Sequence, residues 1–212
     1  AHEICLRGDY LFVISTAFDS VLALDLVAGR FTWGLCIRGQ GEALEAEPFT
    51  PGGAGPAPGD TLHLNQVAVL GEEIYLSGTR SPCWLRLHNN ALELVGYLPA
   101  GTHTVLPLPD GRVYNDTAMD RVLLERGEER LAIAVPRYPV GELEGLDAAN
   151  GPLARQAFAR GLLYLADDCV IGGSSPSTLT AYDFTAERIR AQVNLTMDVR
   201  HAVHGIELWP FD

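Results

Sequence analysis

RGLLYLADDCVIGGS, residues Arg160 to Ser174, is the stretch whose pattern decides the fold, because it returns elsewhere in the chain. It consists of an apolar run, an acidic turn at Asp167, and a second apolar run that ends in a hydroxyl. Short apolar runs on either side of an acidic turn are typical of two antiparallel strands. The stretch therefore predicts a β-hairpin.

Three further stretches and one terminal half copy fit the same frame. HEICLRGDYLFVIST at 2–16 aligns Ile4 with Leu162 and Asp9 with Asp167, without a gap. The other copies are NQVAVLGEEIYLSGT at 65–79, HTVLPLPDGRVYNDT at 103–117 and the half copy HGIELWP at 204–210. Strand-turn-strand units that recur every few tens of residues predict a β-propeller.

The spacing of these rows sets the expected number of blades. They begin at 2, 65, 103, 160 and 204, so the intervals are 63, 38, 57 and 44 residues. The two shorter intervals are close to the roughly 40 to 50 residues of a four-stranded blade. Each complete row is also followed by two more strand-like runs. We therefore predict an all-β propeller of about five four-stranded blades, in a single domain over residues 1–212.

The last of these blades is incomplete, because only Phe211 and Asp212 follow the half copy at 204–210. The chain begins with Ala1 rather than Met, so the missing strands would come from residues further upstream, and six blades would then be expected. Alternatively, another chain supplies the strands, or the ring closes differently. An exposed edge strand pairs readily, so self-association or a partner chain is expected at this blade.

Two long connections do not fit the blades. Residues 38–62 are acidic and then rich in Pro and Gly, and residues 136–158 are similarly irregular, with a short helix expected from Pro152 to Ala159. Long insertions in a compact domain are usually functional lids or linkers. Both connect an outer strand to the next inner strand, so in a propeller they would lie on the same face.

The order of the rows resembles a family of bacterial propeller-like proteins known as a domain of unknown function. The resemblance rests on the order of HEICLRGDYLFVIST, LHLNQVAVLG, the row that begins at His103, FARGLLYLADDCVIGGS and the terminal GIELWP. The first, second and fourth of these are similar to HDI, CHLNGLA and FARGLAF stretches of the family. It covers nearly the whole chain in outline and implies a propeller with extra sequence before the first row. It implies no activity, and this chain is shorter than its relatives.

Composition excludes several classes of function. A net charge of −12 and a pI near 4.8 are the opposite of a surface that binds nucleic acid. No apolar run approaches the roughly 18 residues of a membrane span, and no signal peptide is expected. The four cysteines lack CxxC spacing, which favours reduced thiols in a cytoplasmic protein.

Two columns of the aligned rows carry polar side chains. The first, at the start of each innermost strand, is His2, Asn65, His103, Arg160 and His204; the second, at the end of the next strand, is Thr16, Thr79, Thr117 and Ser174. Because successive strands are antiparallel, both columns lie on one face. We expect them, with Arg80, to line a pocket for a small-molecule ligand at the channel mouth.

The three column histidines suggest a metal site. His2, His103 and His204 would suit a divalent transition metal such as Zn, Fe or Cu, whose bound water is a nucleophile near neutral pH. The protein would then be a metal-dependent hydrolase- or lyase-like enzyme, with Arg160 and Asp116 as candidate catalytic residues. The competing interpretation is that these side chains bond to backbone groups and hold the blades in register.

Two functions therefore follow from the sequence. One is a small-molecule-binding or catalytic propeller with a His/Asn/Arg ring; the other is a non-catalytic protein-interaction scaffold that uses the incomplete blade or the long connections. The acidic residues of the hairpin turns, Asp9, Glu72, Asp110 and Asp167, are explained by turn preference. Trp33, Trp84 and Trp209 are expected to be core residues.

Overall fold

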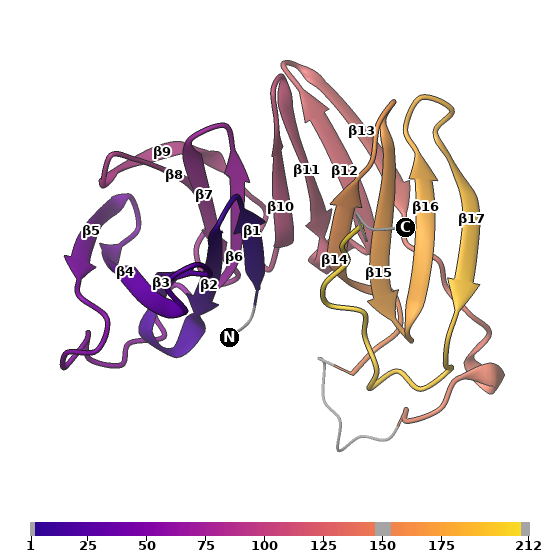
Figure 1. Ribbon diagram of the computed structural model, residues 1–212. Coiled ribbons are helices and arrows are strands. Elements are labelled where there is room, and N and C mark those ends of the chain that lie inside the picture. Colours follow the sequence, from indigo (N-terminus) through magenta and orange to yellow (C-terminus); the bar gives the residue numbers. More distant parts are fainter. Residues whose placement is uncertain (1–2, 147–153, 209–212) are drawn as a thin grey trace. The chain divides into compact units, whose positions relative to one another are not determined.

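A computed structural model describes residues 3–146 and 154–208, which form an almost entirely β structure (Figure 1). Within these residues, 17 strands form four antiparallel sheets in which every strand pairs with the next along the chain. The chain divides into two compact units, residues 1–102 and residues 103–212. Each unit contains two sheets and is described by itself.

Unit 1 contains the sheets of the first two predicted blades. The first sheet is β1 (Ile4–Arg7), β2 (Tyr10–Ser15), β3 (Ser20–Asp25), β4 (Arg30–Gln40) and β5 (Ala43–Phe49), and the second is β6 (Leu64–Leu70), β7 (Glu73–Gly78), β8 (Cys83–His88) and β9 (Ala91–Tyr97). The side chains of Ile14, Val21, Leu35, Leu64 and Leu76 meet in one fully buried core between them. Alternation along each strand accounts for this core, since every second residue faces it.

Unit 2 repeats the arrangement with two four-stranded sheets. They are β10 (His103–Leu108), β11 (Gly111–Asp116), β12 (Arg121–Arg126) and β13 (Glu129–Ala134), then β14 (Phe158–Tyr164), β15 (Cys169–Ser175), β16 (Thr178–Asp183) and β17 (Arg188–Asn194). Its core includes Val113, Val122, Val170, Tyr182 and Phe184, all buried. Three short 3-10 helices complete the described elements: η1 (Thr16–Phe18) and η2 (Thr117–Met119), which follow β2 and β11, and η3 (Val140–Glu142).

The hairpins that the repeat predicts are confirmed. Ile4 pairs with Val13, Val67 with Leu76, and Val105 with Tyr114, so these pairs occupy equivalent positions in three rows. In the fourth row Leu162 pairs with Gly172 across a turn of four residues. The prediction of four strands for each complete row is confirmed in three of the described sheets, and the first sheet has a fifth strand.

The prediction of about five blades is not confirmed, because residues 3–146 and 154–208 form four sheets. The described residues of the last row, 204–208, form no strand. Val203 and His204, where the last row begins, lie against β14 and β15. The Gly161 amide of β14 donates to the Val203 carbonyl at 3.1 Å. A Cβ at Gly173 would lie 2.7 Å from that carbonyl oxygen, so the close approach requires glycine. A lone half row has no second strand with which to form a hairpin, and residues 209–212 lie outside the described chain.

The long connections are more ordered than the sequence suggests. Residues 38–49 lengthen β4 and form the additional strand β5, whose Leu44 and Ala46 pack against the core of unit 1. Only the Pro/Gly-rich residues 50–63 remain irregular. In residues 136–158, the described part of the expected helix is a bend and a turn that lead into β14, and residues 147–153 lie outside the described chain.

Candidate functional site

Irregular pairing marks the start of the inner strands β6, β10 and β14. The register shifts between Leu64 and Gln66, between His103 and Val105, and between Ala159 and Leu162. Such β-bulges bend a strand and redirect the side chains at the bulge. The bulges of β6 and β14 include Asn65 and Arg160 of the first column, and His103 lies directly before the bulge of β10.

Arg160 lies between an aromatic ring and an imidazole in unit 2. Its guanidinium carbon is 4.5 Å from the centroid of the Phe158 ring, and its Nη1 is 2.7 Å from Nε2 of His204. Its Nε is buried and has no hydrogen-bond partner within the described chain. Burial lowers the pKa of this guanidinium, since the charged form loses solvation.

Side chains from the neighbouring sheet hold the backbone of Arg160 in place. The Asn115 amide nitrogen donates to the Arg160 carbonyl at 2.9 Å, and the Thr104 hydroxyl donates to the same oxygen. One residue earlier, the Thr117 hydroxyl donates to the Ala159 carbonyl at 3.0 Å. The bulge of β14 is therefore fixed by three buried polar side chains of β10, β11 and η2.

His103 joins this network through the same threonine. Its Nδ1 lies 3.1 Å from the Thr117 hydroxyl oxygen, and its ring meets the edge of Phe158 with centroids 5.3 Å apart. Because the hydroxyl proton is directed at Ala159, the threonine accepts from His103, which places the imidazole proton on Nδ1. His103, Thr117, Phe158, Arg160 and His204 thus form one connected cluster, which we call the Arg160 cluster.

The two remaining predicted residues of unit 2 have different surroundings. Asp116 is 1% exposed, and its Oδ2 accepts from Arg121 Nε at 2.9 Å while Oδ1 has no partner among the described residues. Ser174 is buried within β15, where it pairs with Ala159 and Thr178. Asp116 is therefore a buried ion-pair residue, and Ser174 is a residue of the sheet.

In unit 1 the predicted ligand residues are mostly buried or already paired. Asn65 and Thr16 have buried side-chain oxygens without a partner within the described chain. Arg80 is half-exposed and donates to the Asp60 carboxylate at 2.7 Å. Thr79 follows β7, and its amide donates to the His63 carbonyl at 3.2 Å. Whether these residues share a pocket with the Arg160 cluster stays a prediction.

Metal binding also stays a prediction. Across residues 3–146 and 154–208, no three His, Cys, Asp or Glu side chains are grouped so that they could hold a metal ion. His2 of the expected triad lies outside the described residues, and His204 is directed at the Arg160 guanidinium. Metal analysis of protein purified without an affinity tag would test the triad directly.

Sequence reasoning noted Asp120 only as a carboxylate beside Thr117, and it did not predict that Asp19 and Asp120 anchor the connections between sheets. Asp19 is 1% exposed and accepts the backbone amides of Thr61, Leu62 and Leu64, while Asp120 accepts from Arg137 and Arg155. Both follow a threonine of the second column in the repeated sequence Thr-Ala-x-Asp, at 16–19 and 117–120. That repeat is the signal that could have found them.

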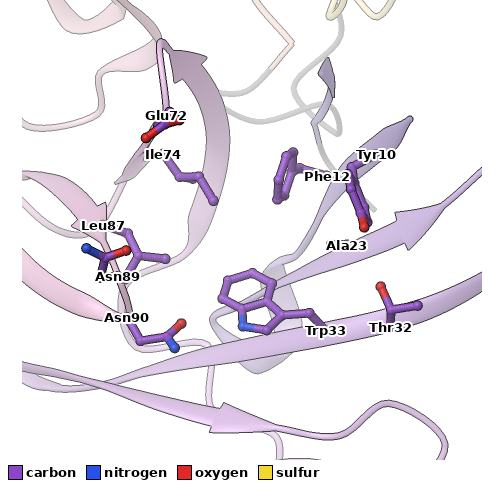
Figure 2. A pocket seen from close by; sticks show the side chains of 10 residues that line it. All are labelled: Tyr10, Phe12, Ala23, Thr32, Trp33, Glu72, Ile74, Leu87, Asn89 and Asn90. Carbon is purple, nitrogen blue, oxygen red and sulfur yellow. The ribbon is translucent and has the colours of Figure 1, made fainter. Parts of the chain in front are cut away.

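A cavity in unit 1 was missed as well. It has a volume of about 460 Å³ and lies among the strands and hairpin turns of both sheets of the unit (Figure 2). Trp33 and Glu72 line it. The sequence pattern predicted Trp33 as a core residue and explained Glu72 by turn preference. Glu72 belongs to the β6–β7 turn, whereas Thr79 and Asn65 lie at the other end of that hairpin. The cavity is therefore at the opposite end of the strands from the polar columns.

Comparison with known proteins shows the fold and nothing finer. No family model matches the sequence, and neither does any curated protein. Among solved structures, the chain is similar to the computationally designed Ika8 protein, with a TM-score of 0.54 and 9% identity over 97% of this chain and 64% of that chain. It is also similar to the WD40 β-propeller domain of Doa1, with a TM-score of 0.51 and 9% identity over 92% of this chain and 70% of that chain. Citrobacter koseri AztD also matches, with a TM-score of 0.50 and 15% identity over 92% of this chain and 57% of that chain.

These similarities, with the four sheets, identify an all-β propeller fold with four blades in this chain. The chain spans less than two thirds of the designed protein and of AztD. None of the described helices has the length and apolar character needed to cross a bilayer. Function has to be argued from the residues, because propellers serve both as enzymes and as scaffolds.

Proposed function

We propose that this propeller binds a small molecule through an anionic group, a carboxylate or phosphate, that is held by Arg160. The observation that carries the proposal is a half-buried guanidinium that forms no ion pair with a carboxylate of residues 3–146 or 154–208. Burying a charge is unfavourable unless it is paired, so such a group favours an external anion. The guanidinium is also planar and presents parallel N–H groups that match the oxygens of a carboxylate or phosphate.

The other arginines provide the comparison that makes Arg160 unusual. Eleven of the fifteen arginines form an ion pair with a carboxylate among the described residues. The four without such a pair are Arg7, Arg30, Arg160 and Arg188, and all except Arg160 are exposed to solvent. In a protein of net charge −12, a half-buried arginine that has no carboxylate partner among the described residues indicates a role other than solubility.

The surroundings of Arg160 support binding because they fix the guanidinium before the ligand arrives. Phe158 lies under its plane, His204 accepts from Nη1, and donors on Thr104 and Asn115 fix its backbone carbonyl. Little side-chain entropy is then lost on binding, which is the main cost for a flexible arginine. His103 and His204 are further donors beside the anion when their rings carry the required proton.

The proposal is tested with inorganic phosphate and acetate as the smallest probes of the two anion classes. We expect the guanidinium N–H signal of Arg160 to shift on titration in NMR spectra. Arg160→Gln should weaken binding of the better probe by about tenfold, since a hydrogen bond to a charged group contributes roughly 1.5–3 kcal/mol. Arg160→Lys should retain part of the affinity, because it keeps the charge and loses the planar fork.

Arg188→Gln is the matched control, since it removes the same charge from an exposed position of β17 in the same unit. It should leave the affinity unchanged. Equal affinities for the wild type and Arg160→Gln would contradict the proposal. An equal loss in both arginine variants would also contradict it, because binding would then depend only on total charge.

A further inference from the structure

The cavity of unit 1 has a wall of aromatic rings. Tyr10 and Phe12 come from β2 and Trp33 comes from β4, and Figure 2 shows the three rings on one side of the space. Trp33 follows a β-bulge, since Ala23 pairs with Trp33 and the next residue, Leu24, pairs with Phe31. The extra residue Thr32 bends β4 at this point and redirects its side chains.

The opposite wall is aliphatic, with polar groups at its edge. Ile74 of β7 and Leu87 of β8 face the rings, and Glu72, Asn89 and Asn90 lie in the hairpin turns beside them (Figure 2). Asn89 and Asn90 have φ angles of 49° and 62°, so both occupy the left-handed region that a two-residue hairpin turn requires. The turn therefore holds two amide side chains at a fixed place on the rim.

The charge at the edge of this cavity is negative. The described residues that line it include the carboxylate of Glu72 and no Arg, Lys or His. Among the described residues, Glu72 has no ion-pair or hydrogen-bond partner, whereas the adjacent Glu73 pairs with Arg86 at 3.2 Å. An anion would meet this carboxylate and no cationic side chain of the described lining, so anionic ligands are disfavoured.

We infer that this cavity, lined by Tyr10, Phe12, Trp33 and Glu72, binds an organic cation, an ammonium group that carries apolar substituents. The faces of aromatic rings attract such cations, most strongly for tryptophan, and their apolar substituents gain from contact with the rings and with Ile74 and Leu87. The carboxylate adds a charge partner at the rim. The volume of about 460 Å³ lies within the usual range for small-molecule sites. This site is separate from the Arg160 cluster and takes a ligand of opposite charge.

The probe is choline, and its neutral isostere 3,3-dimethylbutan-1-ol tests whether charge matters. Calorimetry and tryptophan fluorescence should report saturable choline binding at least about tenfold tighter than binding of the alcohol, since a cation–π contact with partial desolvation is worth roughly 0.5–2 kcal/mol. Trp33→Leu should weaken choline binding by about tenfold. Trp84→Leu is its control, because Trp84 stacks on Tyr75 and does not line the cavity.

The role of charge is tested at Glu72, which is exposed and forms no ion pair or hydrogen bond among the described residues. Glu72→Gln should weaken choline binding about threefold and leave the alcohol unaffected, because an exposed carboxylate contributes up to about 1 kcal/mol. Glu128→Gln makes the same change in an exposed hairpin turn of unit 2 and should have no effect. The inference fails if choline does not bind, if the alcohol binds as tightly, or if Glu72→Gln and Glu128→Gln behave alike.

Discussion

The turn Thr-Ala-Phe-Asp at 16–19 and the turn Thr-Ala-Met-Asp at 117–120 have the same backbone and different electrostatics. Each forms a single 3-10 turn after the second strand of its sheet and ends on an aspartate in the left-handed region, with φ of 44° at Asp19 and 53° at Asp120. In both, the aspartate carbonyl accepts the amide of a residue in or just after the fourth strand of the sheet, Ile37 or Val135, at 2.8 and 2.9 Å.

The carboxylates have different partners. Asp19 accepts three backbone amides, from Thr61 at 2.7 Å, Leu62 at 3.0 Å and Leu64 at 3.1 Å. Asp120 is partly exposed and instead accepts from two arginines, Arg137 and Arg155. Both carboxylates anchor the connection to the next inner strand. The repeat therefore fixes the backbone of the turn, while the sequence of the following connection decides what the carboxylate binds, since residues 50–63 contain no arginine.

The largest effect is expected at Asp19. Asp19→Ala leaves the buried amides of Leu62 and Leu64 without this acceptor, whereas the Thr61 amide still donates to the Gly59 carbonyl at 2.8 Å. Each buried unsatisfied group costs roughly 1–3 kcal/mol before the chain relaxes. We expect the free energy of unfolding of unit 1 to fall by about 3 kcal/mol, measured by urea denaturation with tryptophan fluorescence. Asp19→Asn should lose less, because its amide oxygen still accepts. A loss below about 1 kcal/mol for the alanine variant would contradict this account of the anchor.

Asp120→Ala should have a smaller effect that depends on salt. Its ion pairs are partly exposed, and such pairs contribute about 1 kcal/mol or less each and are screened by ions. We expect the free energy of unfolding to fall by about 1–2 kcal/mol at low ionic strength. The loss should be smaller in about 1 M NaCl, where the Debye length is only about 3 Å and the ion pairs are screened.

The double-mutant cycle with Arg155→Ala isolates the pair itself. A coupling of about 0.5–1 kcal/mol is expected, since direct contacts of this kind are not additive. The comparison between the two turns fails if Asp120→Ala is more destabilising than Asp19→Ala. It also fails if the Asp19 variant has the stronger salt dependence.

The sequence predicted the hairpins because they depend on local alternation, and it failed where a strand depends on a distant partner. β5 contains Glu, Ala and Pro, which are weak strand formers, and it exists because β4 extends to pair with it and the core accepts Leu44. The half row at 204–208 has the better strand pattern and forms no strand. Pairing within a blade was therefore predictable, and the number of blades was not.

The site was predictable in the same limited way. The aligned columns brought His103 and Thr117 together, because both lie at the same end of one hairpin. The cavity beside Trp33 depends on a bulge in β4 and on the packing of two sheets, and neither leaves a periodic signal. A tryptophan in a strand looks like core from the sequence, whereas here its ring lines a cavity.

The smallest effect is expected at Thr16, and it separates the two threonines of the repeated turn. The Thr117 hydroxyl donates to Ala159 and accepts from His103, so Thr117→Val should lower the free energy of unfolding of unit 2 by about 1–2 kcal/mol. The Thr16 hydroxyl oxygen is buried without a hydrogen-bond partner among the described residues, so valine of similar shape removes an unmet polar group. Thr16→Val should therefore change the stability of unit 1 by less than about 0.5 kcal/mol, and in the stabilising direction. Equal losses in the two variants, measured by the same denaturation, would mean that the two turns use their threonines in the same way.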